Sequence, residues 1–163
     1  MESGYDVSNQ LVPRAFGDLR GWIEELEREG ELHTIDAEVD WDCELGTIAR
    51  KTFGNGDGPA LRFRNIKGYG PDDDVWCREV FTGGMSNYSR VAMTLGLPKD
   101  ASVRDLVLAT RHYMQLRTPP VEVANGKVKQ NIHRGDDIDL NKIPVPRWHR
   151  EDGGRYINTY QAT

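Results

Sequence analysis

Cysteine is scarce in this sequence, and its two cysteines, Cys43 and Cys77, lie far apart without forming a C-x-x-C pair. In a chain without an export signal, such residues are expected to be reduced thiols that pack like small apolar side chains. No apolar run approaches the roughly 20 residues that cross a bilayer, and residues 1–14 hold no apolar signal core. These absences argue against a disulfide scaffold, a membrane partner and secretion, so we expect a cytoplasmic protein.

The sequence also lacks the patterns on which several kinds of active site depend. Its net charge is -5, and its most basic stretch, 127–134, is short, which argues against a nucleic-acid partner. No two histidines stand three or four positions apart, no G-x-S-x-G elbow is present, and no P-loop or G-x-G-x-x-G occurs. We therefore assign no metal ligand and no catalytic residue from spacing.

What the sequence does contain is a pattern of amphipathic helices. Apolar spacing predicts helices over 18–29, 42–53 and 86–95. Asp18 is expected to cap the first helix, and Gly30 to end it. A fourth helix begins at Ser102, with Asp105 forming a near capping box, and ends before Pro119-Pro120. Its stripe is expected to be buried and consists of Val103, Leu106, Val107, Thr110 and Met114.

Strand signals alternate with these helices and then replace them. Strands are predicted over 31–39, 60–65 and 75–81. After Pro120, a hairpin is predicted with strands 121–124 and 127–132 around Asn125-Gly126, and a further strand over 155–163. The fold class is therefore a mixed α/β (α+β) N-terminal domain followed by a mostly β part. The expected division is an N-terminal tail, 1–16, an α/β domain, 17–118, and the start of a second domain, 119–163.

Three clusters have both a chemical and a structural interpretation. Gly83-Gly84-Met85 either turns backbone N–H groups toward an anion or makes a tight turn. The carboxylates of Asp136, Asp137 and Asp139 serve either acid–base chemistry or capping. Arg147-Trp148-His149-Arg150, which stands before a turn at 151–154, either lines an anionic pocket or has a structural or interface role.

Three ordered blocks resemble a known family. The first is Asp18-Leu19-Arg20-x-Trp22-Ile23-x-x-Leu26 continuing to Leu32, and the second joins Gly58-Pro59-Ala60-Leu61 to Asn65-Ile66-Lys67-Gly68-Tyr69. The third runs from Gly135-Asp136-Asp137 through Pro144-Val145-Pro146-Arg147-Trp148-His149 to Asp152-Gly153-Gly154-Arg155-Tyr156-Ile157. Together they resemble the N-terminal portion of UbiD-like prenylated-flavin-dependent decarboxylases.

The resemblance implies a fold, a reaction and its cofactors. The part after residue 118 would begin a flavin-binding split β-barrel. The family catalyses reversible non-oxidative decarboxylation of aromatic or α,β-unsaturated carboxylic acids. Its prenylated FMN forms a covalent adduct with the substrate and accepts electrons when CO2 leaves. Manganese holds the flavin phosphate with potassium nearby, and members are usually homo-oligomers.

The same resemblance limits which residues can be assigned. The family's cofactor-binding Asn and Arg, metal-binding His and Glu, and catalytic Glu pair follow the Gly-Gly-Arg-Tyr-Ile block, beyond Thr163. We therefore carry over no catalytic or metal-binding residue, and expect Thr159 to lie at the edge of the flavin pocket. Gln161 stands where some relatives have Gly.

The sequence stops inside the strand predicted over 155–163, which favours a fragment of a longer enzyme. On that hypothesis this chain alone is inactive and binds no flavin. The alternative is a small non-catalytic interaction module, or a subunit that completes an enzyme in trans by pairing its final strand with a partner.

Overall fold

A computed structural model describes Leu11 and residues 15–157. The helices and strands of this part are α1 (Leu19–Arg28), β1 (Leu32–Ile35), α2 (Glu44–Phe53), β2 (Ala60–Phe63), β3 (Val80–Thr82), α3 (Tyr88–Thr94) and α4 (Val103–Gln115). The 3-10 turns η2 (Lys127–Lys129), η3 (Gly135–Asp137) and η4 (Leu140–Lys142) follow α4. The expected mixed α/β fold is confirmed.

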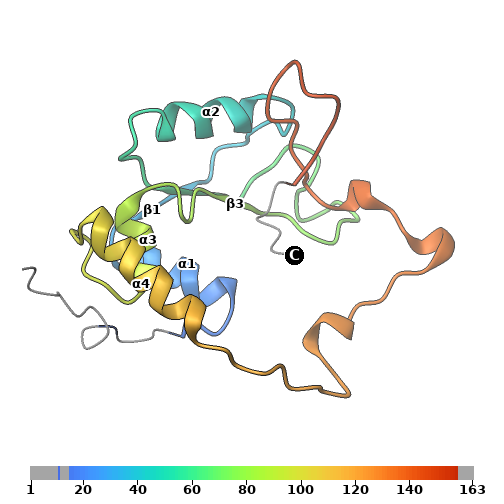
Figure 1. Ribbon diagram of the computed structural model, residues 1–163. Coiled ribbons are helices and arrows are strands. Elements are labelled where there is room, and N and C mark those ends of the chain that lie inside the picture. The colour runs from blue at the N-terminus through green and yellow to red at the C-terminus, as the bar shows by residue number, and fades with distance from the viewer. Residues whose placement is uncertain (1–10, 12–14, 158–163) are drawn as a thin grey trace, which may run out of the picture.

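The strands form a small sheet in the order β1-β2-β3. β1 and β2 are parallel, with Leu32 opposite Ala60 and Ile35 opposite Phe63, while β2 and β3 are antiparallel. α2 therefore serves as the crossover that joins two parallel strands. Figure 1 shows α2 on one side of the strands and α1, α3 and α4 on the other.

The core divides according to the alternation of β2. Leu61 and Phe63 pack in one cluster with Leu45 of α2, whereas Ala60 packs in another with Leu26 of α1. Successive side chains of a strand point to opposite faces, so one four-residue strand supports both layers. A further cluster joins α3 to α4.

The predicted helix caps are largely confirmed. The Asp18 side chain accepts hydrogen bonds from the first turn of α1, and Gly30 takes the left-handed φ of 71° that ends it. Ser102 and Asp105 form the capping box of α4. The helix expected over 86–95 begins at Tyr88, and its cap is Asn87, whose side chain accepts from the N–H of Arg90.

Two predicted strands are shorter in the structure. The first ends at Ile35, although an isolated parallel bridge between Val39 and Ile66 continues its direction. The strand expected over 75–81 begins only at Val80. The reason is that the N–H of Trp76 donates to Lys142 O at 2.9 Å and so takes no part in the sheet.

The hairpin predicted over 121–132 is wrong. Residues 121–126 are irregular and η2 occupies the expected second strand. Val121 is 83% exposed and Val128 is 89% exposed, so the segment does not bury its apolar side chains. A two-stranded hairpin is marginal in water without such packing. Residues 155–157 are not a strand either, and the rest of that prediction lies outside the described residues.

Candidate functional site

Arg147, from the cluster that sequence suggested for an anionic pocket, binds the chain's own carboxylate. Its Nε donates to Asp42 Oδ1 at 2.6 Å, and its backbone N–H donates to Trp41 O at 3.0 Å. The side-chain hydrogen bond from Arg147 holds the pKa of Asp42 below its usual value. The structural interpretation therefore applies to Arg147, since its charge is already paired.

Cys43 stands beside this pair in a strained conformation. Its φ of 68° is left-handed, although it is not glycine, and its N–H donates to Arg147 O at 2.8 Å. Desolvation, followed by the hydrogen bond to Asp42, raises the pKa of the Cys43 thiol, which opposes a reactive thiolate. Cys43 and Cys77 are both free, but Cys77 is exposed. The prediction that both thiols pack as small apolar residues is therefore wrong for Cys77.

Trp148 and His149 lie against α2 and not in an isolated loop. With Arg50 and Thr82 they line a recess of 350 Å³. Gly46 allows the close approach, because a Cβ at that position would stand 2.1 Å from Trp148 O. The Trp148 Nε1–H donates to Tyr156 O at 3.0 Å. This contact favours a structural role for Trp148.

The other candidate clusters serve local structure. Asp139 accepts from the N–H of Asn141 at 3.0 Å and so caps η4, while its neighbours Asp136 and Asp137 are exposed. Asp152 accepts from the N–H of His149 at 2.8 Å within the turn expected there. Gly83 has a φ of 77°, and the turn interpretation holds for Gly83-Gly84-Met85.

Arg90 is a buried charge that the sequence did not reveal. Its side chain is 0% exposed and donates to four groups. They are Gly83 O at 3.1 Å, Glu31 Oε2 at 3.0 Å, Gly58 O at 2.8 Å and Ser86 Oγ at 2.6 Å. The polar residues at the start of α3 do not indicate from sequence that an arginine there is buried. Because Arg90 ties three loops together, its first role is to shape them.

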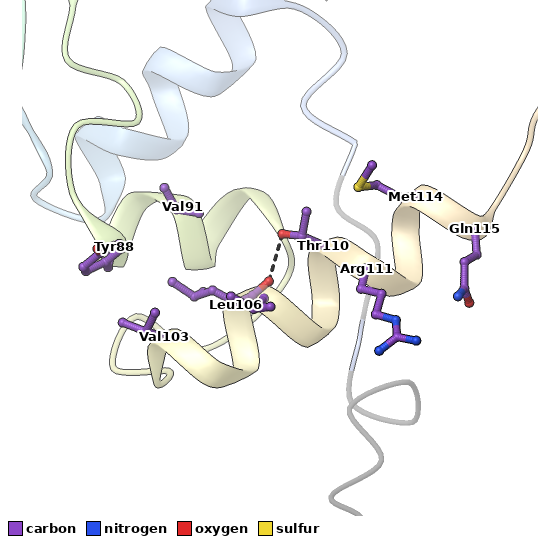
Figure 2. A pocket seen from close by; sticks show the side chains of 9 residues that line it. Tyr88, Val91, Val103, Leu106, Thr110, Arg111, Met114 and Gln115 are labelled. Carbon is purple, nitrogen blue, oxygen red and sulfur yellow. Dashed lines mark hydrogen bonds between the residues drawn. The ribbon is translucent and has the colours of Figure 1, made fainter.

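An apolar groove of 530 Å³ lies along α3 and α4 (Figure 2). Figure 2 shows Tyr88 and Val91 on α3, Val103 and Leu106 in the first turns of α4, and Met114 near the far end of α4. The stripe expected to be buried is exposed at Val103, Val107 and Met114, by 52%, 61% and 78%. Leu106 is buried as expected, together with Ala109 outside the stripe, so the prediction is wrong for most of the stripe.

The described residues contain no donor set for the metal that the resemblance implies. Among residues 11 and 15–157, no group of three or more His, Cys, Asp or Glu side chains could hold a metal ion. Thr159, the expected edge of the flavin pocket, lies outside the described residues. Within the same part of the chain, no helix has the length and apolar character that a bilayer span requires.

The mixed α/β fold with its small sheet matches the N-terminal region of UbiD-class structures. The family comparison agrees. Residues 23–110 match the 3-octaprenyl-4-hydroxybenzoate carboxy-lyase N-terminal domain, and residues 120–163 match the Rift-related domain of the same carboxy-lyase. The chain belongs to this UbiD family.

Curated and solved relatives are decarboxylases or UbiD-class enzymes. Pyrrole-2-carboxylic acid decarboxylase of Pseudomonas aeruginosa is 34% identical over 88% of this chain and 29% of its own length. The open form of vanillic acid decarboxylase from Sedimentibacter hydroxybenzoicus is 31% identical, with a TM-score of 0.75 over 88% of this chain and 30% of that one.

A third relative adds information about the cofactor. HmfF from Pelotomaculum thermopropionicum, in complex with FMN, is 29% identical with a TM-score of 0.66 over 85% of this chain and 28% of its own. An evolved dimeric form of HmfF is in complex with prFMN. The present chain thus spans about 30% of the length of the relatives it matches.

Proposed function

We propose that this chain is the N-terminal part of a carboxy-lyase. The whole enzyme catalyses reversible, non-oxidative decarboxylation of an aromatic or α,β-unsaturated carboxylic acid with prenylated FMN. One observation carries the proposal: two domains of one carboxy-lyase family match in order across residues 23–163. The flavin part is supported by a UbiD-class relative that binds FMN and, in an evolved form, prFMN.

The chemistry belongs to residues outside the described part. Since that part supplies no metal donor set, the proposed Mn²⁺ and K⁺ would be bound elsewhere, and no reaction step is assigned to its side chains. Its own task in the proposal is to carry and orient the first flavin-domain segment. The expectations that 1–163 alone is inactive and binds no flavin follow from this division.

The proposed enzyme is a cytoplasmic homo-oligomer. The two free cysteines suit a reducing compartment. An oligomer is consistent with the evolved dimeric form of one relative. The division into a tail 1–16, an α/β domain 17–118 and a flavin-domain start 119–163 is part of the same proposal, with Thr159 at the pocket edge.

The deciding measurement is the intact mass of the native gene product, with the reading frame sequenced past the Thr163 codon. A longer product that binds prenylated FMN and releases CO2 from an aromatic or α,β-unsaturated acid supports the proposal. The matched control is 1–163 incubated with the same flavin, which should stay colourless. A product of 18.5 kDa without flavin contradicts the proposal and favours a subunit that completes an enzyme in trans.

A further inference from the structure

Arg155 connects the returning segment to two aromatic rings of the N-terminal domain. The Arg155 guanidinium carbon lies 4.1 Å from the centroid of the Trp41 ring and 5.8 Å from that of Tyr69. Its Nε donates to Val145 O at 2.6 Å, and its Nη2 donates to Ile143 O at 3.2 Å and to the Tyr69 hydroxyl. One planar cation therefore contacts two aromatic rings and three oxygens.

Tyr69 extends the same contact to a second point of the returning segment. It is only 5% exposed, and its hydroxyl accepts from Arg155 and donates to Asn141 O at 2.8 Å. Trp41 and Tyr69 lie within the match to the N-terminal domain, and Asn141 and Arg155 lie within the Rift-related match. The cluster of Trp41, Tyr69 and Arg155, called the latch below, thus joins the two family domains.

The segment that precedes the latch contributes little to this joint. Residues 116–125 and 127–138 are exposed throughout, so the connection after α4 does not dictate where the chain returns. Pro144 and Pro146 are buried at the return point, and Tyr156 N–H donates to Pro146 O at 3.2 Å. The position of residues 141–157 therefore depends on the contacts made after residue 140.

We propose that Arg155 is a positioning residue. Through the latch it fixes residues 141–157 on the N-terminal domain and so sets how the start of the flavin-binding domain lies against that domain. The part of this inference that concerns the flavin-binding domain rests on the function proposed above. Arginine suits this task because its flat guanidinium stacks on a ring while its edge donates to several acceptors, which an ammonium group cannot do.

The test is residue-resolved amide hydrogen exchange on the 1–163 chain. Arg155→Met keeps the length of the side chain and removes its donors and charge. The sensitive amides are Arg147, bonded to Trp41 O, and Tyr156, bonded to Pro146 O. Their exchange should rise about tenfold, the change that ~1.4 kcal/mol of lost stabilisation produces. Arg155→Lys should give an intermediate rise, and Arg150→Met, at an exposed position of the same segment, none.

Hydrogen exchange at a reference amide in the core distinguishes a local positioning role of Arg155 from a contribution to overall stability. The N–H of Ala60, bonded to Glu31 O at 2.8 Å, lies in the core and should exchange in Arg155→Met as in the wild type. An equal rise at Ala60 and Arg147 would mean loss of overall stability and would overturn the proposal. Unchanged exchange at Arg147 and Tyr156 would overturn it as well.

A second variant disturbs the contact between the returning segment and the N-terminal domain from the side of α2. Gly46→Ala drives a methyl group into Trp148 O and should raise exchange at Arg147 and Tyr156, as Arg155→Met does. Gly153→Ala, which meets no atom within 4 Å, is its control. All these measurements are made without flavin. A native product that binds no flavin would therefore contradict the proposed function and leave the latch intact, whereas unchanged exchange would refute the latch alone.

Discussion

At the scale of single residues, Arg90 is the fully buried charged side chain of the part of the chain that the structure describes. A fully buried guanidinium has lost its hydration and depends on its four acceptors for compensation. Glu31, its charged partner, also accepts from Lys99 Nζ at 3.3 Å. The carbonyls of Gly58 and Gly83 would lose a donor if Arg90 were removed. Removing Arg90 is therefore expected to lower stability more than removing one partner of an exposed ion pair with a similar N–O distance.

We predict that Arg90→Met lowers the free energy of unfolding by about 3–5 kcal/mol, as expected when one partner of a buried charge pair is removed. Urea unfolding followed by circular dichroism measures the change. The control, Arg104→Met at an exposed position of α4, should lie within about 0.5 kcal/mol of the wild type. An Arg90→Met protein as stable as this control would refute the role assigned to Arg90.

The Asp42–Arg147 pair gives a pH prediction. Arg147 lowers the pKa of Asp42 below the ordinary value of 3.8, so the folded state prefers the ionised carboxylate. Its contribution is complete above the unfolded-state pKa and is lost as pH falls through the lower, folded-state pKa. The wild type should therefore exceed Asp42→Asn in urea midpoint at about pH 6, and the difference should shrink as pH falls below the ordinary pKa of 3.8. A difference independent of pH would contradict this assignment.

Residues that act locally were predictable, and residues that act at a distance were not. Asp18, Ser102 and Gly30 carry their signal in adjacent residues, because a cap satisfies groups within one turn. Arg90 bonds to Glu31, 59 positions away, and no local pattern encodes that distance. Arg155 lies in the third block of the resemblance, but its stacking on Trp41, 114 positions away, depends on the fold.

At the scale of elements, α4 shows how a correct helix can carry a wrong burial prediction. Apolar spacing established the helix, but the sequence does not say which part of a broad apolar face meets the core. In the structure Leu106 and Ala109 pack in the α3–α4 cluster, and Val103 and Val107 remain on the surface. The hairpin failed for a related reason, since Asn125-Gly126 favours a turn whether or not strands find partners.

Substitutions on α4 should separate its two faces. Leu106→Ala removes a side chain that is 5% exposed and should cost about 2–5 kcal/mol of unfolding free energy through the cavity it leaves. Val107→Ala, at a neighbouring position that is 61% exposed, should change stability by no more than about 0.5 kcal/mol. Thermal and urea unfolding of the 1–163 chain provide the comparison. Equal losses at the two positions would show that the outer face of α4 is also packed.

At the scale of the whole molecule, the chain leaves the α/β domain after α4 and returns to it beyond η3 (Figure 1). The outlying stretch is exposed along almost its whole length, although His133 stacks on Trp76 with ring centroids 3.9 Å apart. The return point is held by the latch and by the Asp42–Arg147 pair. Covalent continuity through the outlying stretch is therefore not what keeps the returning segment in place.

Limited trypsin digestion should confirm this arrangement. Proteases cut exposed, irregular chain first, so the earliest cleavages should fall after Arg117, Lys127, Lys129 or Arg134 and not in α2. The two pieces should then co-elute on gel filtration, because the contacts made after residue 140 survive the cut. The same digestion of Arg155→Met should release the C-terminal piece, while Arg150→Met should retain it. Separation of the wild-type pieces would mean that the returning segment is held only through the intact chain.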